Sequence, residues 1–231
     1  MVVLVDSFNI MNSEVFFEKL KQQVKTFLEK DWSWHDYRHA ERVFVNACKL
    51  QQQEWWDLLV IGSAALVHDM CRPREKQTWK SHFWDEALVI IRWVLESIIW
   101  YTDDQIRSIL NIVSLHDIYD RSNPTDKNIE LKVVQDADNL DAIWALWIAR
   151  TFAFWWSHGL SIYIPWEDLS YEEDFEEIPW KYTTTISHFY EKLLKISKHM
   201  NTLYGKELAK QRHQFMEVFL SKFFDERNGL S

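Results

Sequence analysis

Residues 58–69 read LLVIGSAALVHD, and this stretch decides the fold class. Apolar residues fill almost every position, so a helix formed here would be apolar on all sides and would lie at the centre of the protein. Asp57 precedes the stretch and is a residue type that begins helices. The stretch ends in an adjacent histidine and aspartate, His68 and Asp69. We therefore predict a buried helix that carries two ionisable groups at its end.

Apolar residues recur at helical spacing on both sides of this stretch. Thr102 and Gln105 have the spacing of a capping box, which predicts a helix beginning at that point. Further helices are predicted over residues 13–30, 37–52, 81–98, 102–116, 129–154, 183–200 and 202–226. Loops are predicted over residues 31–36, 72–80 and 121–128, with an irregular acidic stretch at 157–181. No run alternates at strand period, so we expect an all-α fold.

The chain has 231 residues, of which 47% are hydrophobic and 26% charged, as in an ordinary globular protein. We expect one domain, a helical bundle over residues 13–228, after an N-terminal tail of residues 1–12. The formal net charge of -9 argues against binding to nucleic acid polymers, although it leaves room for a small anionic substrate. The two cysteines have no zinc or redox spacing, and the N-terminus lacks the features of a signal peptide. These features predict a cytoplasmic protein with no membrane span.

Four short segments place histidine or aspartate within helices that otherwise look buried. They are HDYRHAERV (35–43), AALVHDM (64–70), SLHDIYD (114–120) and VVQDADNLDAI (133–143). Burying ionisable groups is costly unless they are paired or bind a metal ion. Imidazole nitrogens together with carboxylate oxygens suit Mn, Fe, Zn, Co or Ni. A divalent cation is therefore the simplest explanation for the four segments together.

Each residue also has an ordinary structural interpretation. A lone buried histidine is usually a hydrogen-bonded core residue. Asp138 has an alternative as a solvent-facing neighbour of Asp141 on one helix face. Only the four segments in this order argue for a metal site.

The order His39, His68–Asp69, Asp138 resembles the H…HD…D pattern of the HD superfamily of metal-dependent phosphohydrolases. The resemblance to its small YpgQ/YedJ-like members extends over about residues 13–226. The strings that carry it are HDYRHAERV, AALVHDMCRPRE, KSHF, QDADNLDAI, IARTFAF and SHFYEKLLK. It implies a helical bundle in which His39, His68, Asp69 and Asp138 bind the metal. It also implies hydrolysis of a phosphate ester or anhydride. Within this subgroup, the resemblance implies cleavage of nucleoside triphosphates to monophosphate and pyrophosphate, with Mn as the metal. Fe, Co, Ni, Zn and Mg are the alternative metals.

The resemblance and the residue chemistry together suggest roles for further side chains. A divalent cation lowers the pKa of a bound water, and Asp69 is placed to bind the metal, orient that water, or both. His116 and His82 are candidate catalytic residues, with helix capping as the alternative. The basic residues that follow Asp69 are candidates for binding phosphate, with a solvated loop as the alternative. They are Arg72, Arg74, Lys76 and Lys80.

We expect a small phosphorylated substrate, a nucleotide in the first place. The oligomeric state is open, and a homodimer is one option. An alternative function is a non-catalytic metal- or nucleotide-binding regulatory module. A third is a di-iron oxygenase, which would need additional histidine and aspartate ligands.

The tryptophans are anomalous in number and position, with 14 Trp against 4 Gly in the chain. Trp32, Trp34 and Trp100 fall at predicted breaks, where Gly is common. Trp144 and Trp147 follow LDAI, where the resembled family carries small residues. Our hypothesis is that many of these codons are UGA, which some bacteria read as Gly and others as Trp. The alternative is a naturally Trp-rich protein. If Trp144 and Trp147 are genuine, their core spacing predicts that both indoles point largely inward.

Overall fold

A computed structural model of the chain describes residues 2–29, 35–54, 56–78, 80–81, 83–98, 101–118, 128–167, 169 and 184–230. The side chains of residues 2–14, 54, 76 and 77 are outside this description. All regular structure in the described ranges is helical, apart from one isolated bridge between Ser161 and Thr184. The predicted all-α fold class is therefore confirmed. The chain divides into two compact units, Met1–Asp138 and Asn139–Ser231.

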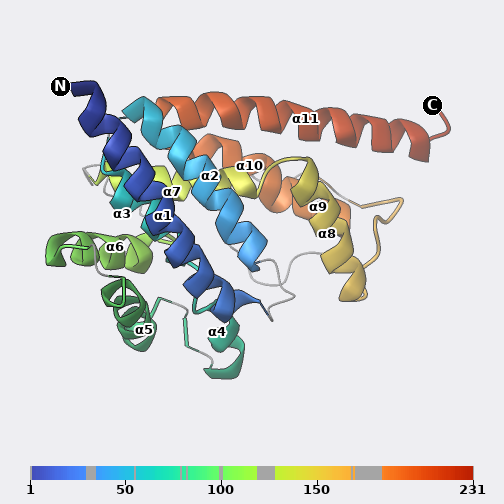
Figure 1. Ribbon diagram of the computed structural model, residues 1–231. Helices are drawn as coiled ribbons and strands as arrows, with labels where there is room; N and C mark the ends of the chain where they lie inside the picture. The colour runs from blue at the N-terminus through green and yellow to red at the C-terminus, as the bar shows by residue number, and fades with distance from the viewer. Residues whose placement is uncertain are drawn as a thin grey trace. The chain divides into compact units, whose positions relative to one another are not determined.

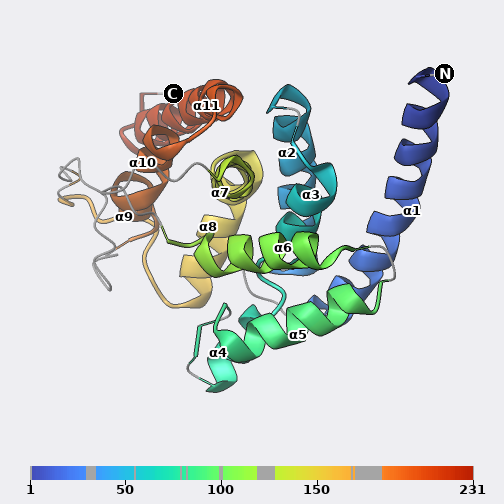
Figure 2. The same ribbon diagram turned by 90° about the vertical axis from the view of Figure 1, so that its left-hand side faces the viewer.

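The first unit is built around one central helix. Its helices are α1 (Val2–Leu28), α2 (Tyr37–Glu54), α3 (Leu58–Val67), α4 (Arg72–Thr78), α5 (Asp85–Glu96), α6 (Asp103–Leu115) and most of α7 (Ile129–Asp141). α3 packs against α1, α2 and α6, and α5 packs against α6. Figures 1 and 2 show α2 and α3 side by side, with α6 passing close to the end of α3. All residues of α3 from Val60 to Val67 are buried, as the sequence predicts for a helix that is apolar all round.

Two local features position α3. The Asp57 carboxylate accepts from the backbone N–H groups of Leu59 and Val60, which caps the helix N-terminus. Farther along, Gly62 allows neighbouring aromatic rings to approach the α3 backbone closely. A Cβ added there would lie 2.7 Å from the ring of Phe17 and 3.0 Å from the ring of Phe44. The cap sets where α3 begins, and the close approach at Gly62 sets how the helix packs against α1 and α2 before it reaches His68 and Asp69.

The second unit contains α8 (Ala145–Ser157), α9 (Thr185–His188), the π-helical turn η1 (Phe189–Leu193), α10 (Leu194–Ile196), the 3₁₀ turn η2 (Ser197–His199) and α11 (Leu203–Arg227). The long α11 helix, which ends near the C-terminus in Figure 1, packs against α8 and α10. The rings of Phe152, Phe189 and Phe219 contact one another within this unit. Among the described residues, no helix is both long and apolar enough to cross a membrane.

The helix boundaries differ from the sequence predictions at three places. Residues 72–78 form helix α4 and not a loop, because Pro73 lies in the first turn, where the missing N–H costs nothing. The single helix predicted over 129–154 is interrupted between α7 and α8, where the Trp144 backbone is extended. The capping box at Thr102 and Gln105 is confirmed. α1 begins at Val2, before the predicted start at Ser13, since no Pro or Gly interrupts that segment.

The tryptophan predictions have mixed outcomes. Trp147 is 9% exposed and points inward as expected, but the prediction for Trp144 is wrong. Trp144 is 42% exposed, and its indole packs against Phe215 on the surface of the second unit. Trp32, Trp34 and Trp100 lie outside the described residues.

Candidate metal centre

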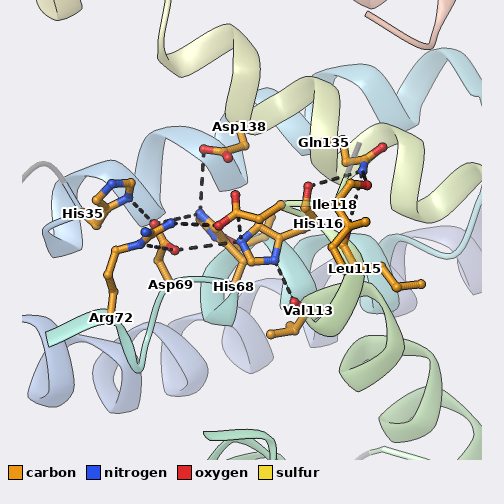
Figure 3. A network of polar contacts seen from close by, with 12 residues as sticks. His35, His68, Asp69, Arg72, Val113, Leu115, His116, Ile118, Gln135 and Asp138 are labelled. Carbon is orange, nitrogen blue, oxygen red and sulfur yellow. Dashed lines mark hydrogen bonds and ion pairs between the residues drawn. The ribbon is translucent and has the colours of Figure 1, made fainter. Parts of the chain in front are cut away.

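Two His–Asp pairs follow the ends of the neighbouring helices α3 and α6. In each pair, the histidine Nδ1 donates to the backbone carbonyl three residues earlier, at 2.8 Å for His68 and Ala65 and 2.7 Å for His116 and Val113. Because a carbonyl only accepts hydrogen bonds, each Nδ1 carries a proton, which leaves the Nε2 of each ring as the atom that a metal ion could bind. Figure 3 shows both rings directed toward Asp69.

Helices α2 and α7 supply the other two predicted ligands, His39 and Asp138. The His39 Nε2 lies 3.3 Å from the His68 Nε2 and 3.3 Å from the Asp138 Oδ1. The Asp69 Oδ2 lies 3.5 Å from the His39 Nε2 and 3.4 Å from the His68 Nε2. The His68 Nε2 and the Asp138 Oδ1 are 3.8 Å apart. The structure therefore brings the four predicted ligands together.

This spacing fits one metal ion. First-row metals bind imidazole nitrogen and carboxylate oxygen at about 2.0–2.2 Å, which places neighbouring donors roughly 3–3.5 Å apart. The five distances that join His39 and His68 to each other and to the two aspartates range from 3.3 to 3.8 Å. The donor set of two imidazoles and two carboxylates is typical of Mn, Fe, Co, Ni or Zn.

The charges in the centre also favour a cation. Burial alone would raise the pKa of Asp69, but Arg72 and the imidazoles of His35 and His68 outweigh burial and hold this pKa well below its usual range. Burial likewise opposes ionisation of Asp138, yet hydrogen bonding to His39 and the charge of His68 lower its pKa. Burial would lower the pKa of His68, but Asp69 and Asp138 raise it. Both carboxylates are thus held in the ionised form that binds a cation.

The Asp69 carboxylate is held on both of its oxygens (Figure 3). His35, in the segment before α2, contacts the Oδ2 through its Nδ1. The Arg72 Nε donates to the Oδ1 at 2.9 Å, and the same guanidinium donates to the Asp117 Oδ2 at 3.1 Å. Arg72 thus orients the carboxylate from its far oxygen, as supporting residues of metal sites commonly do, whereas His35 shares the Oδ2 that faces His39 and His68.

His35 and Asp117 were missed by the sequence interpretation. His35 lies four residues before His39 in HDYRH, and Asp117 completes a second His–Asp pair in SLHD. The repeated pair was a usable signal, because a helix that places one histidine in a site also places the next residue near it. Nothing in the sequence indicates that His35 meets Asp69, 34 positions away.

The other predicted site residues lie in different places. The His116 Nε2 is 3.9 Å from the Asp69 Oδ1, next to the four ligands. Arg74 and Lys80 line a separate surface hollow with Cys71 and Trp84, where Lys80 pairs with Glu86 at 2.8 Å. His82 and the side chain of Lys76 lie outside the described residues.

Comparison with known proteins decides the family. No family model matches the chain. The crystal structure of an HD-superfamily hydrolase from Bacillus thuringiensis is 33% identical, with a TM-score of 0.71 over 94% of this chain and 98% of that one. The chain belongs to the HD superfamily of hydrolases. It is accordingly an enzyme of the HD metal-dependent phosphohydrolase type.

A second relative is YpgQ from Bacillus subtilis, an uncharacterized protein that is 29% identical over 217 residues, 92% of this chain and 94% of its own length. The crystal structure of YpgQ in complex with ADP has a TM-score of 0.66, at 28% identity, and covers 91% of this chain and 100% of that one.

Proposed function

We propose that this hydrolase cleaves a small phosphate compound, in the first place a nucleotide, with Mn²⁺ bound by His39, His68, Asp69 and Asp138. The observation that carries the proposal is that the His39 and His68 Nε2 atoms lie 3.3 Å from each other and 3.3 to 3.8 Å from a carboxylate oxygen of both Asp69 and Asp138. Such a cation, when bound, lowers the pKa of water and offsets charge on phosphoryl oxygens. Mn²⁺ is preferred because it is the usual metal of the subgroup that the sequence resembles.

The surrounding residues have defined parts in this proposal. Asp69 binds through the Oδ2, while Arg72 holds its Oδ1 and keeps the carboxylate in one orientation. His116 directs its Nε2 into the centre and is our candidate for contacting the phosphoryl group, with His82 as the second candidate. Arg72, Arg74 and Lys80 are proposed to bind phosphate, Arg72 beside the metal and the other two at the hollow beyond α4.

Two observations support a nucleotide as the substrate. The similar YpgQ protein was crystallised with ADP. The net charge of -9 disfavours a nucleic acid polymer, whose binding needs an extended basic surface. We infer cleavage of a nucleoside triphosphate to monophosphate and pyrophosphate, in the cytoplasm. The free thiols of Cys48 and Cys71 are compatible with that reducing compartment.

A metal-by-substrate screen tests the proposal. Metal-free protein is loaded separately with Mn²⁺, Fe²⁺, Co²⁺, Ni²⁺, Zn²⁺ or Mg²⁺, and phosphate and pyrophosphate release is measured with nucleoside mono-, di- and triphosphates. We expect pyrophosphate release from triphosphates, fastest with Mn²⁺. Binding of metal and nucleotide without turnover would support the non-catalytic module instead. Tight, salt-sensitive binding to duplex DNA or RNA would contradict a small substrate.

A further inference from the structure

A second group of possible metal donors lies next to the four-ligand site. The His116 Nε2 is 3.9 Å from the Asp69 Oδ1 and 3.7 Å from the Asp117 Oδ1. Asp69 faces the first site with its Oδ2, so its Oδ1 is directed to this second group. A carboxylate shared in this way is how two metal ions about 3.5–4 Å apart are commonly bridged. His116, Asp69 and Asp117 thus form an incomplete second cation site.

Arg72 occupies the space between the carboxylates of that second group. Its Nε donates to the Asp69 Oδ1 at 2.9 Å, and its Nη2 donates to the Asp117 Oδ2 at 3.1 Å. The Nη1 lies 3.6 Å from Glu75. A guanidinium stays charged under all physiological conditions, and its planar fork matches carboxylate oxygens. The positive charge required by both aspartates is therefore already supplied by the chain.

We propose that the Arg72 guanidinium takes the place of a second divalent cation, so that each chain binds one metal ion. The inference rests on the proposed metal site, but not on which phosphate compound is cleaved. In this role, Arg72 has two effects on the reaction. Asp69 is restricted to binding the first metal, and a fixed positive charge lies where a second metal would otherwise meet a phosphoryl oxygen. Because its Nε and Nη2 donate to the two aspartates, the guanidinium would act on a phosphoryl oxygen mainly as a fixed positive charge.

Metal stoichiometry tests the proposal without any assay of activity. Wild type and Arg72→Met are saturated with Mn²⁺ and desalted, and their metal content per chain is measured. We expect one ion in the wild type and two in Arg72→Met, because the loss of the guanidinium exposes the Asp69 Oδ1 and Asp117. Two neighbouring Mn²⁺ ions should also give a spin-coupled electron paramagnetic resonance spectrum, which a single ion does not.

Three variants serve as controls. Arg72→Lys keeps a cation and should bind one ion, and Arg74→Met removes an exposed arginine of the same helix and should also bind one. Arg72→Met combined with Asp117→Asn removes a donor of the new site and should return to one. Circular dichroism checks the helical fold of each variant, and Arg72→Gln replaces Arg72→Met if the latter does not fold.

The remaining outcomes overturn the proposal in distinguishable ways. Two ions in the wild type would show that Arg72 does not exclude a second cation. One ion or none in a folded Arg72→Met would show that it does not stand in for one, while the proposed function would still stand on the single site of the wild type. A wild type that binds no divalent metal would overturn the proposed metal centre together with this inference.

Discussion

Asp69 is the residue on which the metal centre depends most. It is 1% exposed, and its two oxygens contact the side chains of His35, His68 and Arg72, among others. Removing it would take one carboxylate partner from Arg72, which keeps Asp117, and would leave the His35 and His68 imidazoles without their shared anion. Removal of a buried partner of this kind is strongly destabilising unless the site relaxes or fills with water.

We expect Asp69→Ala and His68→Ala each to lose bound metal and to lower turnover by at least about a hundredfold, because the metal activates the water. The measurements are metal content, the rate constant kcat and far-UV circular dichroism, which should stay helical. His158→Ala, which removes an exposed histidine of the second unit, is the matched control and should retain both properties. Wild-type turnover by either site variant would disprove the ligand assignment.

We expect His35→Ala to weaken metal binding about 10- to 100-fold without abolishing it, because His35 holds the Asp69 Oδ2 from outside the four-donor set. His35→Asn should recover much of the affinity, since the Asn amide can donate from nearly the position of Nδ1. Metal affinity is measured by titration calorimetry. A complete loss of metal in His35→Ala, equal to that in His68→Ala, would make His35 a ligand in its own right.

The buried His188 makes the folding stability of the second unit depend on pH. Burial, and to a smaller extent Lys192, lowers the pKa of His188 to about 3, below its ordinary value of 6.5. The unfolded chain therefore binds a proton that the folded chain does not, so stability is lost as pH falls from 6.5 toward 3. The loss is roughly 1.4 kcal/mol for each pH unit in that window.

We expect His188→Leu to flatten the fall in the free energy of unfolding between about pH 6.5 and pH 4, because the variant has no proton to gain at this position. Urea unfolding at several pH values measures this free energy and its slope against pH. His158→Leu, which changes an exposed histidine in the same unit, should keep the wild-type slope. An unchanged slope in His188→Leu would show that the histidine already binds its proton in the folded state.

The residue scale also shows what sequence order reveals about a site. The order of His39, His68–Asp69 and Asp138 predicts that these residues meet, and they do, although their binding of metal stays a prediction. The order carries no information on Arg72 meeting Asp117, because that contact depends on how the ends of α3 and α6 are placed. The spacing of apolar residues predicts where a helix lies. It does not predict which side chains meet beyond the end of that helix.

At the scale of elements, α3 was the easiest to predict and the segments around it the hardest. Its apolar run and the Asp57 cap are local signals, and the same holds for the Thr102 capping box. The polar residues of α4 carry no apolar period, so its helical state was missed. The break between α7 and α8 was hidden because apolar residues continue through it at helical spacing.

We expect Gly62→Ala to destabilise the protein, although Ala favours an isolated helix by about 1 kcal/mol. The new methyl group would lie 2.7 Å from the buried Phe17 ring, and overpacking a core typically costs about 1–3 kcal/mol. Thermal unfolding of Gly62→Ala and of Gly62→Ala/Phe17→Leu measures the effect. The double variant should lose less than the sum of its parts, and strict additivity would show that α1 and α3 do not meet closely here.

At the scale of the whole molecule, the exposed tryptophans are the main departure from an ordinary composition. Trp56, Trp84, Trp156 and Trp166 are all substantially exposed, with Trp166 at 84%. Tryptophan is large and is highly buried on average, so several exposed indoles in one chain are unusual. Trp93 is 64% exposed in the middle of α5, where Gly would weaken the helix, so the hypothesis of misread Gly codons suits it less well.

Trp144 fits the misread-codon hypothesis better. It stands at the N-terminus of α8, in extended backbone where the predicted continuous helix is interrupted. An indole at this position does little for the core, because its ring lies on the surface against Phe215. Glycine there would interrupt the helix equally well and would expose no apolar ring to water.

Intact mass of the protein from its native source tests the hypothesis directly. Each tryptophan that is read as glycine lowers the mass by about 129 Da, from the difference in residue formulae. We expect a deficit that is a whole multiple of this value, with peptide sequencing placing Gly at Trp144 and at other break positions. A protein carrying Gly at Trp32, Trp34, Trp100, Trp144 and Trp147 should then express better and melt at a higher temperature than the 14-Trp chain, because the fold would have evolved around glycine at these positions and the larger side chains would strain it. A native mass that matches all 14 tryptophans would refute the hypothesis, and the exposed indoles would then require a partner or surface that covers them.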